Sequence, residues 1–382
     1  MYPCMATTDH SHYDLIIIGA GPSGSACALA LKNAGLRIAI VDKHHFPRDK
    51  VCGDAIPGRA IKFLHQLDPA FADRLSAFSE KLPTRSTVCY YNNKKLDFTW
   101  SLEAYTATRE HFDNFLFAAI KNTGIHTMEG VAVTGIERSA NGFTVTTKEN
   151  RYQCTMLIGA DGINGISAKK LTDRQMDRKH HVAGLRAYYK GVSGMEETCT
   201  EVYFDRKYLP GYFWVFPIKG GIVNAGMGIL SDTVVRQKIN VKHAFYDFIE
   251  RSPVLREKFK HAEPLETLKG CGLPMGSRRV NMCGDHFMLV GDAASLIDPV
   301  SGDGIGNAVL SGKLAAEQAM ACFASGNFSA AFMDHYAQRL YAAAGAVMRK
   351  KTRVLKTMAK MPFLFELAFI AGQNRIIKKF MK

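Results

Sequence analysis

The chain of 382 residues is long enough for two joined domains with a sizeable core, and its apolar and charged fractions, 47% and 22%, exclude a largely disordered protein. The formal net charge of +14 predicts an anionic partner. Zinc-finger spacings and RNA-binding aromatic patterns are absent from the sequence, so we expect an anionic membrane surface or an anionic substrate, and no nucleic acid. Nine cysteines without a CxxC pair argue against a disulfide framework and a metal site.

The first 14 residues lack the apolar segment of a signal peptide, and no apolar run reaches the roughly 18 residues of a membrane-spanning helix. The scattered cysteines suit a reducing compartment. We therefore expect a cytoplasmic protein that touches the inner face of a membrane without crossing it.

The N-terminal segment predicts a strand, a helix and a second strand. Residues 14–19 (DLIIIG) form an apolar run ending in glycine, residues 23–35 are small and helix-forming, and residues 37–42 (RIAIVD) are apolar again. Further along we expect a helix at 59–67, strands at 86–101, a helix at 109–124, buried strands ending near 159 and 290, antiparallel strands at 180–231, and helices at 241–260, 304–323 and 328–352. This order predicts an α/β fold in which a Rossmann-type domain carries an inserted antiparallel sheet and a helical C-terminal region.

The predicted domains follow the same pattern. A discontinuous cofactor-binding domain spans 12–85, 105–175 and 280–325, an antiparallel substrate domain spans 86–104 and 176–279, and a helical region spans 326–382. From Arg349 onward, ten Lys or Arg residues stand against one acid, Glu366, and flank the apolar segment MPFLFELAFIAG. Such a tail is typical of an interfacial membrane anchor, and equally of a helical cap with a solvated basic face.

The turn between the first strand and the first helix reads Gly19-Ala20-Gly21-Pro22-Ser23-Gly24. Gly19 permits the sharp turn, Gly21 lets the backbone approach a pyrophosphate, and Gly24 lets the helix pack on the strand. Asp42, followed by Lys43, ends the second strand, where a carboxylate accepts a ribose hydroxyl and repels the 2′-phosphate of NADP. Strand, helix and acid together predict a dinucleotide site rather than a bare turn.

Two more glycine-containing turns follow apolar strands, Gly159-Ala160-Asp161-Gly162 and Gly291-Asp292-Ala293-Ala294. Either turn alone is ordinary turn chemistry. After the second, a glycine-rich segment feeds a helix that begins around Gly304, Ile305 and Gly306. A helix N-terminus suits a negatively charged group of a ligand, and a loop without a ligand is the alternative.

In this order and spacing, the three turns resemble the FAD-dependent group that includes p-hydroxybenzoate hydroxylase, squalene epoxidase, flavin halogenases and geranylgeranyl reductases. The resemblance covers residues 13–325 and implies one bound FAD, with Asp292 at its ribityl and pyrophosphate part and Asp161 near the flavin. Arg109 precedes a predicted helix and matches an arginine that such proteins place near FAD. The alternative for Arg109 is a solvated charge at the start of the helix.

Two segments are similar to the geranylgeranyl reductase family in particular. Residues 47–54 (PRDKVCGD) resemble its loop over the flavin, which includes Lys50, Cys52 and Gly53 here. Residues 211–217 (GYFWVFP) resemble its Tyr-x-Trp-x-Phe-Pro segment at the substrate cavity, and partly the Trp-x-Trp-x-Ile-Pro of halogenases; the residues concerned are Tyr212, Trp214, Phe216 and Pro217. Strand alternation puts the three aromatic residues on one face, which a cavity wall and a core layer require equally.

Cys52 is the candidate catalytic residue, because Lys50 and a nearby flavin favour a reactive thiolate. The alternative is a small residue that fits a tight loop. The resemblance implies an FAD-dependent oxidoreductase that reduces prenyl C=C bonds of an isoprenoid lipid or a quinone. The alternatives are a monooxygenase or halogenase-like enzyme acting on an aromatic or lipid substrate, and a flavin-bound redox sensor. Because a second GxGxxG unit is absent from the sequence, NAD(P)H or a ferredoxin-type donor would deliver electrons transiently.

Overall fold

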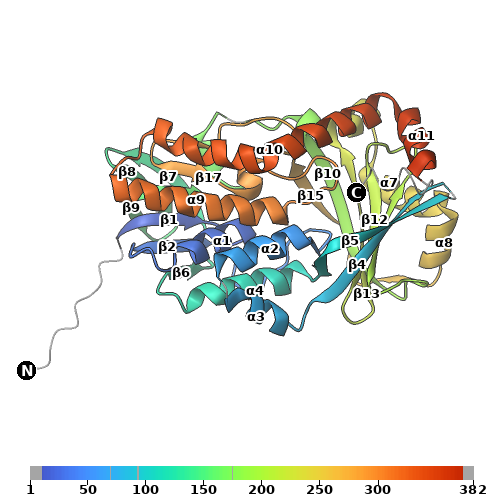
Figure 1. Ribbon diagram of the computed structural model, residues 1–382, viewed down its shortest axis with the longest axis horizontal. Helices are drawn as coiled ribbons and strands as arrows, with labels where there is room; N and C mark the ends of the chain where they lie inside the picture. Colours follow the sequence, from blue (N-terminus) through green and yellow to red (C-terminus); the bar gives the residue numbers. More distant parts are fainter. Residues whose placement is uncertain (1–10, 69, 93, 174, 373–382) are drawn as a thin grey trace, which may run out of the picture.

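The computed structural model describes residues 11–68, 70–92, 94–173 and 175–372. Two β-sheets lie side by side along the long axis of the molecule, and helices cover both of them (Figure 1). The predicted fold class is therefore confirmed. The domain boundaries given above stay a prediction.

The first sheet has a parallel centre that the N-terminal sequence predicts well. Its strand order is β16-β17-β9-β1-β2-β6, with the hairpin β7–β8 joined to β9. The strands are β1 (His12–Ile18), β2 (Ile38–Asp42), β6 (His126–Glu129), β7 (Val133–Ser139), β8 (Gly142–Thr147), β9 (Arg151–Gly159), β16 (Cys283–Gly284) and β17 (Phe287–Leu289). Leu15, Ile16 and Ile17 of β1 are fully buried, as a strand covered on both faces requires.

Of the helices in the described residues, six lie in this half of the molecule. They are α1 (Pro22–Leu31), α2 (Gly58–Leu67), α3 (Ala70–Ala77), α4 (Arg109–Lys121), α5 (Ser167–Leu171) and α9 (Ile305–Ser325). Two of them, α1 and α9, contact each other through small residues. A Cβ at Gly312 of α9 would lie 2.2 Å from the Ser23 carbonyl oxygen of α1, so glycine is what allows these two helices to touch.

The second sheet is mostly antiparallel. Its strand order is β14-β10-β13-β12-β11-β4-β5-β3, with β15 also paired to β10, and the β11–β4 pair is parallel. The strands are β3 (Ala55–Ile56), β4 (Leu82–Tyr91), β5 (Lys94–Thr106), β10 (His181–Lys190), β11 (Cys199–Phe204), β12 (Tyr212–Ile218), β13 (Ile222–Leu230), β14 (Glu263–Pro264) and β15 (Lys269–Pro274). β4 and β5 extend beyond the strands expected at 86–101, and the last residues of β5, Tyr105 and Thr106, pair with β3.

One predicted helix proves to be two. The helix expected at 241–260 divides into α7 (Val241–Arg251) and α8 (Pro253–Phe259). Ser252 accepts a hydrogen bond from the amide of Leu255 through its hydroxyl, and Pro253 occupies the first turn of α8, so both residues start a new helix there. α6 (Ser231–Arg236) precedes this pair, and the two short 3₁₀ turns are η1 (Arg178–His180) and η2 (Gly291–Ala294).

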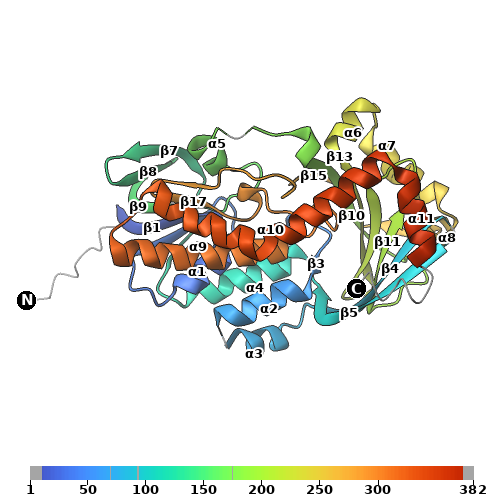
Figure 2. The same cartoon turned by 45° about the horizontal axis from the view of Figure 1, so that its top comes forward.

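The helix expected at 328–352 is longer than predicted. α10 (Ala330–Lys360) begins on the first sheet, where Met333 and Tyr336 are buried, and continues across to the second sheet, where Leu355 and Met358 are buried (Figure 2). α11 (Pro362–Gly372) follows and packs Phe369 against Tyr91 of β4. Within the described ranges, no helix is both long and apolar enough to cross a membrane.

Candidate functional site

The turn at residues 19–24, here called the phosphate turn, is built as the sequence predicts. Gly19 has φ +99°, and a Cβ there would lie 2.5 Å from the Ala160 carbonyl oxygen. A Cβ at Gly24 would lie 1.9 Å from the Gly19 carbonyl oxygen, so the helix approaches the turn as closely as glycine allows. A Cβ at Gly21 would meet only Arg48 Nη2, 3.7 Å away, which leaves open space beside the helix N-terminus, the kind of position that suits an anion.

Asp42 braces this turn from the end of β2. Its carboxylate accepts hydrogen bonds from the amides of Ala20 (2.8 Å) and His44 (2.9 Å), and it is buried. Each oxygen retains a lone pair for a ribose hydroxyl. Lys43, next in the chain, is exposed.

The other predicted cofactor segments converge on the phosphate turn. Gly291 has φ +60°, and a Cβ there would lie 2.6 Å from Ser23 Oγ. Asp292 Oδ2 lies 2.9 Å from Lys50 Nζ, and a Cβ on Gly304 would lie 3.5 Å from Asp292 Oδ1. Segments that are more than 240 residues apart in sequence therefore form one polar surface.

Two details of this surface differ from the simplest expectation. The carboxylate of Asp303 already accepts hydrogen bonds from the first amides of α9, those of Ile305 (3.0 Å) and Gly306 (3.3 Å). Asp161 likewise accepts a hydrogen bond from the Ser167 amide at 2.8 Å, and burial raises the pKa of its carboxyl. Both carboxylates therefore stabilise the N-terminus of a helix, α9 for Asp303 and α5 for Asp161. Gly162 has φ +75° and open space beside it.

Arg109 is not the solvated charge that the alternative reading assumed. Its guanidinium is 3% exposed and makes two 2.7 Å hydrogen bonds to the carboxylate of Asp113, one helical turn later. Arg48 Nη1 lies 2.8 Å from the same carboxylate. Burial opposes the charged form of each group, but Asp113 raises the pKa of Arg109, and Arg109 holds the pKa of Asp113 below its ordinary value.

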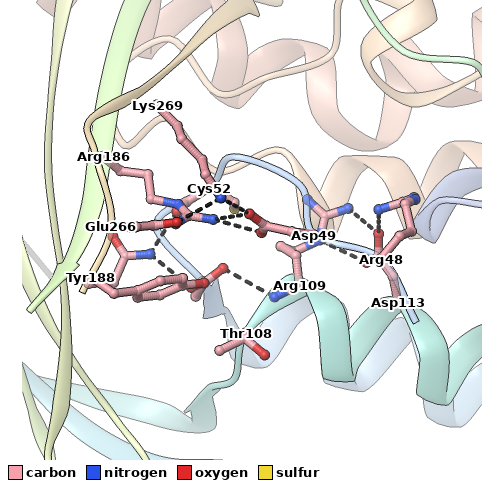
Figure 3. Close-up of polar contacts among 12 residues, drawn as sticks. Arg48, Asp49, Cys52, Thr108, Arg109, Asp113, Arg186, Tyr188, Glu266 and Lys269 are labelled. Carbon is pink, nitrogen blue, oxygen red and sulfur yellow. Dashed lines mark hydrogen bonds and ion pairs between the residues drawn. The ribbon is translucent and has the colours of Figure 1, made fainter. Parts of the chain in front are cut away.

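Residues Cys52–Asp54 meet the second sheet in a buried contact, here called the junction (Figure 3). Asn224 of β13 donates hydrogen bonds to the Cys52 carbonyl oxygen and to Asp54 Oδ2, both at 2.8 Å, and accepts one from Trp214 Nε1 at 2.9 Å. Tyr188 of β10 also donates to Asp54 Oδ2, at 2.6 Å. The sequence analysis identified neither Asn224 nor Tyr188; for Asn224 the available signal was a polar residue inside the apolar strand IVNAGMGIL.

A charged cluster lies beside the junction. Arg186 of β10 is fully buried, and its Nη2 lies 2.6 Å and 2.9 Å from the two carboxylate oxygens of Asp49. Glu266 pairs with the same guanidinium, and Lys269 lies 3.0 Å from Asp49 and 2.6 Å from Glu266. Figure 3 shows how this cluster ties the loop that carries Cys52 to β10 and β15.

An apolar cavity of about 40 Å³ opens next to Trp214. Tyr212 and Trp214 line it together with Val182, Leu230, Leu273, Met275, Ile297, Val300 and Leu355. Phe216 instead lies against Gly53, whose Cβ would be 3.3 Å from the ring, and the Pro217 carbonyl oxygen accepts a hydrogen bond from the hydroxyl of Thr106. The aromatic strand thus supplies part of a cavity wall and part of the junction.

Comparisons with known proteins agree with this geometry. Residues 12–351 match the family model described as FAD binding domain. The menaquinone reductase of Mycolicibacterium smegmatis is 29% identical over 80% of this chain and 75% of its own, and the digeranylgeranylglycerophospholipid reductase of Methanococcus vannielii is 28% identical over 86% and 82%.

Solved structures agree on the fold. A geranylgeranyl bacteriochlorophyll reductase-like protein from Thermoplasma acidophilum superimposes with a TM-score of 0.78 at 22% identity, covering 92% of this chain and 88% of that one. A flavin-dependent brominase gives a TM-score of 0.81 at 21% identity, covering 97% and 92%. At these identities, the likeness concerns the fold alone.

Proposed function

The chain belongs to the FAD binding domain family, and from that premise we propose that this FAD-dependent oxidoreductase reduces C=C bonds in the prenyl part of an isoprenoid lipid or a quinone. The observation that best supports this proposal is that Trp214 contacts both the Cys52–Asp54 loop and the apolar cavity. Its indole is held against the Cys52–Asp54 loop on one side and lines an apolar cavity on the other. The names of the two curated relatives support the same substrate class.

The residues divide the work in this proposal. The phosphate turn, Asp42, Lys50 and Asp292 hold the polar tail of FAD, and Arg109 supports the loop beside it. Reduced FAD, when bound, supplies a hydride, and a proton completes the saturation of each double bond. The apolar wall binds the prenyl chain and excludes water.

The cavity has to widen for this substrate. About 40 Å³ holds only a few water molecules, so a prenyl chain enters by displacing lining side chains. Two of the lining residues connect the cavity to other parts of the fold, because Tyr212 donates a hydrogen bond to the Ser301 carbonyl at 2.6 Å and Leu355 lies on α10.

The test is turnover without oxygen. Protein with chemically reduced FAD is incubated anaerobically with prenyl diphosphates, prenyl ether lipids and prenylated quinones, and product masses are measured. We expect a gain of two hydrogens per reduced bond. Absence of such products from all three classes, combined with substrate-stimulated oxygen consumption, would replace this proposal by a monooxygenase or halogenase-like activity.

The electron donor in this proposal visits transiently, as NAD(P)H or as a ferredoxin-type protein. Anaerobic bleaching of the flavin absorbance by NADH, NADPH or reduced ferredoxin, each compared at equal concentration, identifies the class. The expected result is fast bleaching by one of these and slow bleaching by the others.

The proposal also includes peripheral contact with an anionic membrane through α10 and α11. Exposed apolar side chains on these helices are Val347, Val354, Met361, Phe363, Leu367 and Ile370, and exposed basic ones are Arg349, Lys350, Arg353, Lys356 and Lys360. The combination of apolar anchors and neighbouring cations suits an anionic lipid surface. Lys351 is half-buried and pairs with Asp298 at 2.6 Å, and the other basic residues of the tail, Arg375, Lys378, Lys379 and Lys382, lie outside the described residues.

A point-substitution test suits this contact better than truncation, because Phe369 of α11 is buried against Tyr91. The triple change Phe363→Ser, Leu367→Ser and Ile370→Ser is expected to abolish sedimentation with vesicles that contain anionic phospholipid, and wild-type binding should fall with salt. The matched control changes three exposed apolar residues elsewhere, Val235, Tyr246 and Leu265, to serine. Equal loss in both triples would remove the membrane contact from the proposal.

A further inference from the structure

We propose that Asn224 is a positioning residue, which fixes the Trp214 indole and the Cys52–Gly53 backbone in one relation across the boundary between cofactor and substrate. This inference rests on the proposed function for its catalytic consequence. Its structural part, the coupling of Trp214 to the Cys52 loop, can be tested without substrate.

The first support is that Asn224 uses its whole side chain on this task. The amide has two N–H donors and one oxygen, and the three partners are the Cys52 carbonyl, the Asp54 carboxylate and the Trp214 indole. Asn224 is fully buried, so water does not compete for these bonds. Among the described residues, Trp214 lines the cavity and Asn224 does not, so Asn224 affects the cavity through Trp214.

The second support is the fit around the indole. A Cβ at Gly226, opposite Trp214 in the β12–β13 register, would lie 2.1 Å from Trp214 Cζ2. A Cβ at Gly53 would lie 3.3 Å from Trp214 Nε1. The ring is therefore wedged between two glycine backbones, and the hydrogen bond to Asn224 selects its orientation within that slot.

The third support is the conformation of the loop itself. Asp54 has φ +62°, a region that non-glycine residues seldom adopt, and its carboxylate is fully buried. Besides Asn224 and Tyr188, the Arg109 amide donates to Asp54 Oδ1 at 3.3 Å, and the Ala107 amide donates to its carbonyl oxygen at 3.1 Å. A backbone held in an unusual conformation from four sides is typical of a functional loop.

The experiment uses tryptophan as the reporter, because the chain has two, and Trp100 is half-exposed while Trp214 is buried. In a Trp100→Phe background, Asn224→Ala is expected to shift the Trp214 emission and to leave FAD content unchanged. With a prenyl substrate, kcat should fall about 100-fold at nearly constant KM, the size expected for misplacement by about 1 Å.

Two further variants separate positioning from a general loss of a buried hydrogen bond. Tyr203→Phe removes the 2.6 Å hydrogen bond to Glu201 elsewhere in the same sheet and should leave both kcat and the Trp214 emission unchanged. Asn224→Ala combined with Trp214→Phe should be no slower than the slower single variant, since both act on one unit.

Asn224→Asp keeps the acceptor for Trp214 but places a second carboxylate beside Asp54, with Tyr188, Arg186 and Arg109 as the other ionisable neighbours. Two carboxylates at this distance share a proton, so emission and rate should return toward wild type as pH falls. This variant also covers the case in which Asn224→Ala does not fold.

The inference is overturned if the Trp214 emission is the same with and without the Asn224 side chain, or if kcat is unchanged. It is also overturned if Tyr203→Phe is as slow as Asn224→Ala. If the emission shifts as expected while wild-type protein reduces no prenyl substrate, the proposed function fails and the coupling of Trp214 to the loop stands.

Discussion

The phosphate turn and the junction both hold backbone in a fixed place, but they are assembled differently. The phosphate turn is six consecutive residues, and its shape follows from where glycine is required, at Gly19 and Gly24. The junction joins Cys52–Asp54 to Trp214 and Asn224 of the neighbouring strands β12 and β13, with Asn224 170 residues after Asp54, and holds them with side-chain hydrogen bonds. A local turn can be altered at one residue with a local result, whereas a change in the junction spreads to every partner.

The largest expected effect concerns the ligand of the phosphate turn. Gly21→Val should purify without FAD, because the added side chain fills the space beside the helix N-terminus. Its backbone is extended, φ −69° and ψ −177°, which valine adopts freely, so the FAD-free protein should keep its unfolding free energy to within about 0.5 kcal/mol. Flavin content per chain and denaturant unfolding measure the two quantities.

Trp214→Ala is the comparison for that prediction and should retain FAD. Equal flavin content in the two variants would contradict the division between a cofactor turn and a substrate wall. Gly24→Ala, in contrast with Gly21→Val, should lose both stability and FAD, since its Cβ would lie 1.9 Å from the Gly19 carbonyl oxygen.

The next effect tests what supports the loop of the junction. Asp113→Ala leaves two guanidinium groups, those of Arg109 and Arg48, without their shared buried carboxylate. The unfolding free energy should fall by about 3–5 kcal/mol, measured by denaturant titration. Glu137→Ala removes an exposed ion pair with Arg151 and should change it by less than about 1 kcal/mol. A similar cost for both variants would mean that Asp113 does not support the fold in this way.

The third effect is a pH dependence located in the junction. Burial raises the pKa of Asp54 to about 6, against the hydrogen bonds from Tyr188 and Asn224 and the charges of Arg186 and Arg109. The folded state therefore binds this proton more tightly than the unfolded state, and stability is lost as pH rises from about 4 to about 6. The loss amounts to about 3 kcal/mol and persists above that range.

Asp54→Asn lacks this titration, so its unfolding free energy should increase relative to wild type as the pH is raised from 4 to 7. Unfolding curves at both pH values give the difference, and all other titrating groups cancel in it. Parallel pH profiles for the two proteins would place the carboxyl of Asp54 near its ordinary pKa.

The smallest effect joins the two regions. Lys50 lies in the loop before the junction, is partly exposed, and pairs with Asp292 beside the phosphate turn. Lys50→Met should lower the stability of the FAD-free protein by less than about 1 kcal/mol, because exposed pairs contribute little. FAD retention should weaken, but less than in Gly21→Val. If FAD affinity is unchanged across a range of salt concentrations, Lys50 does not contribute to cofactor binding.

The two regions also differ in how far sequence could predict them. Glycine spacing, an apolar strand and a terminal acid identify the phosphate turn, because all three requirements are met within residues 14–42. Asp113, four residues after Arg109, had a helical-spacing signal that was available but unused. Nothing local indicates that Asn224 reaches Cys52, because that contact depends on the placement of β13 against a loop 172 residues earlier.

The division of the predicted helix at 241–260 into two helices also shows how local signals can be read incorrectly. Ser252 and Pro253 carry an explicit start signal, yet the apolar periodicity on both sides resembles one helix. The extension of α10 to Lys360 is the opposite case. Its last turns are held by contacts with the second sheet, through Leu355 and Met358, which no local pattern contains.

α10 has a mechanical consequence of its own. It is one continuous helix of 31 residues, about 46 Å long. Near one end Tyr336 donates a hydrogen bond to the Leu289 carbonyl, and near the other end Leu355 and Met358 pack against the second sheet. Because α10 is attached to both sheets, it opposes a hinge motion that would move the two sheets apart. We therefore expect a substrate to enter the cavity end first, without a hinge motion that separates the two sheets.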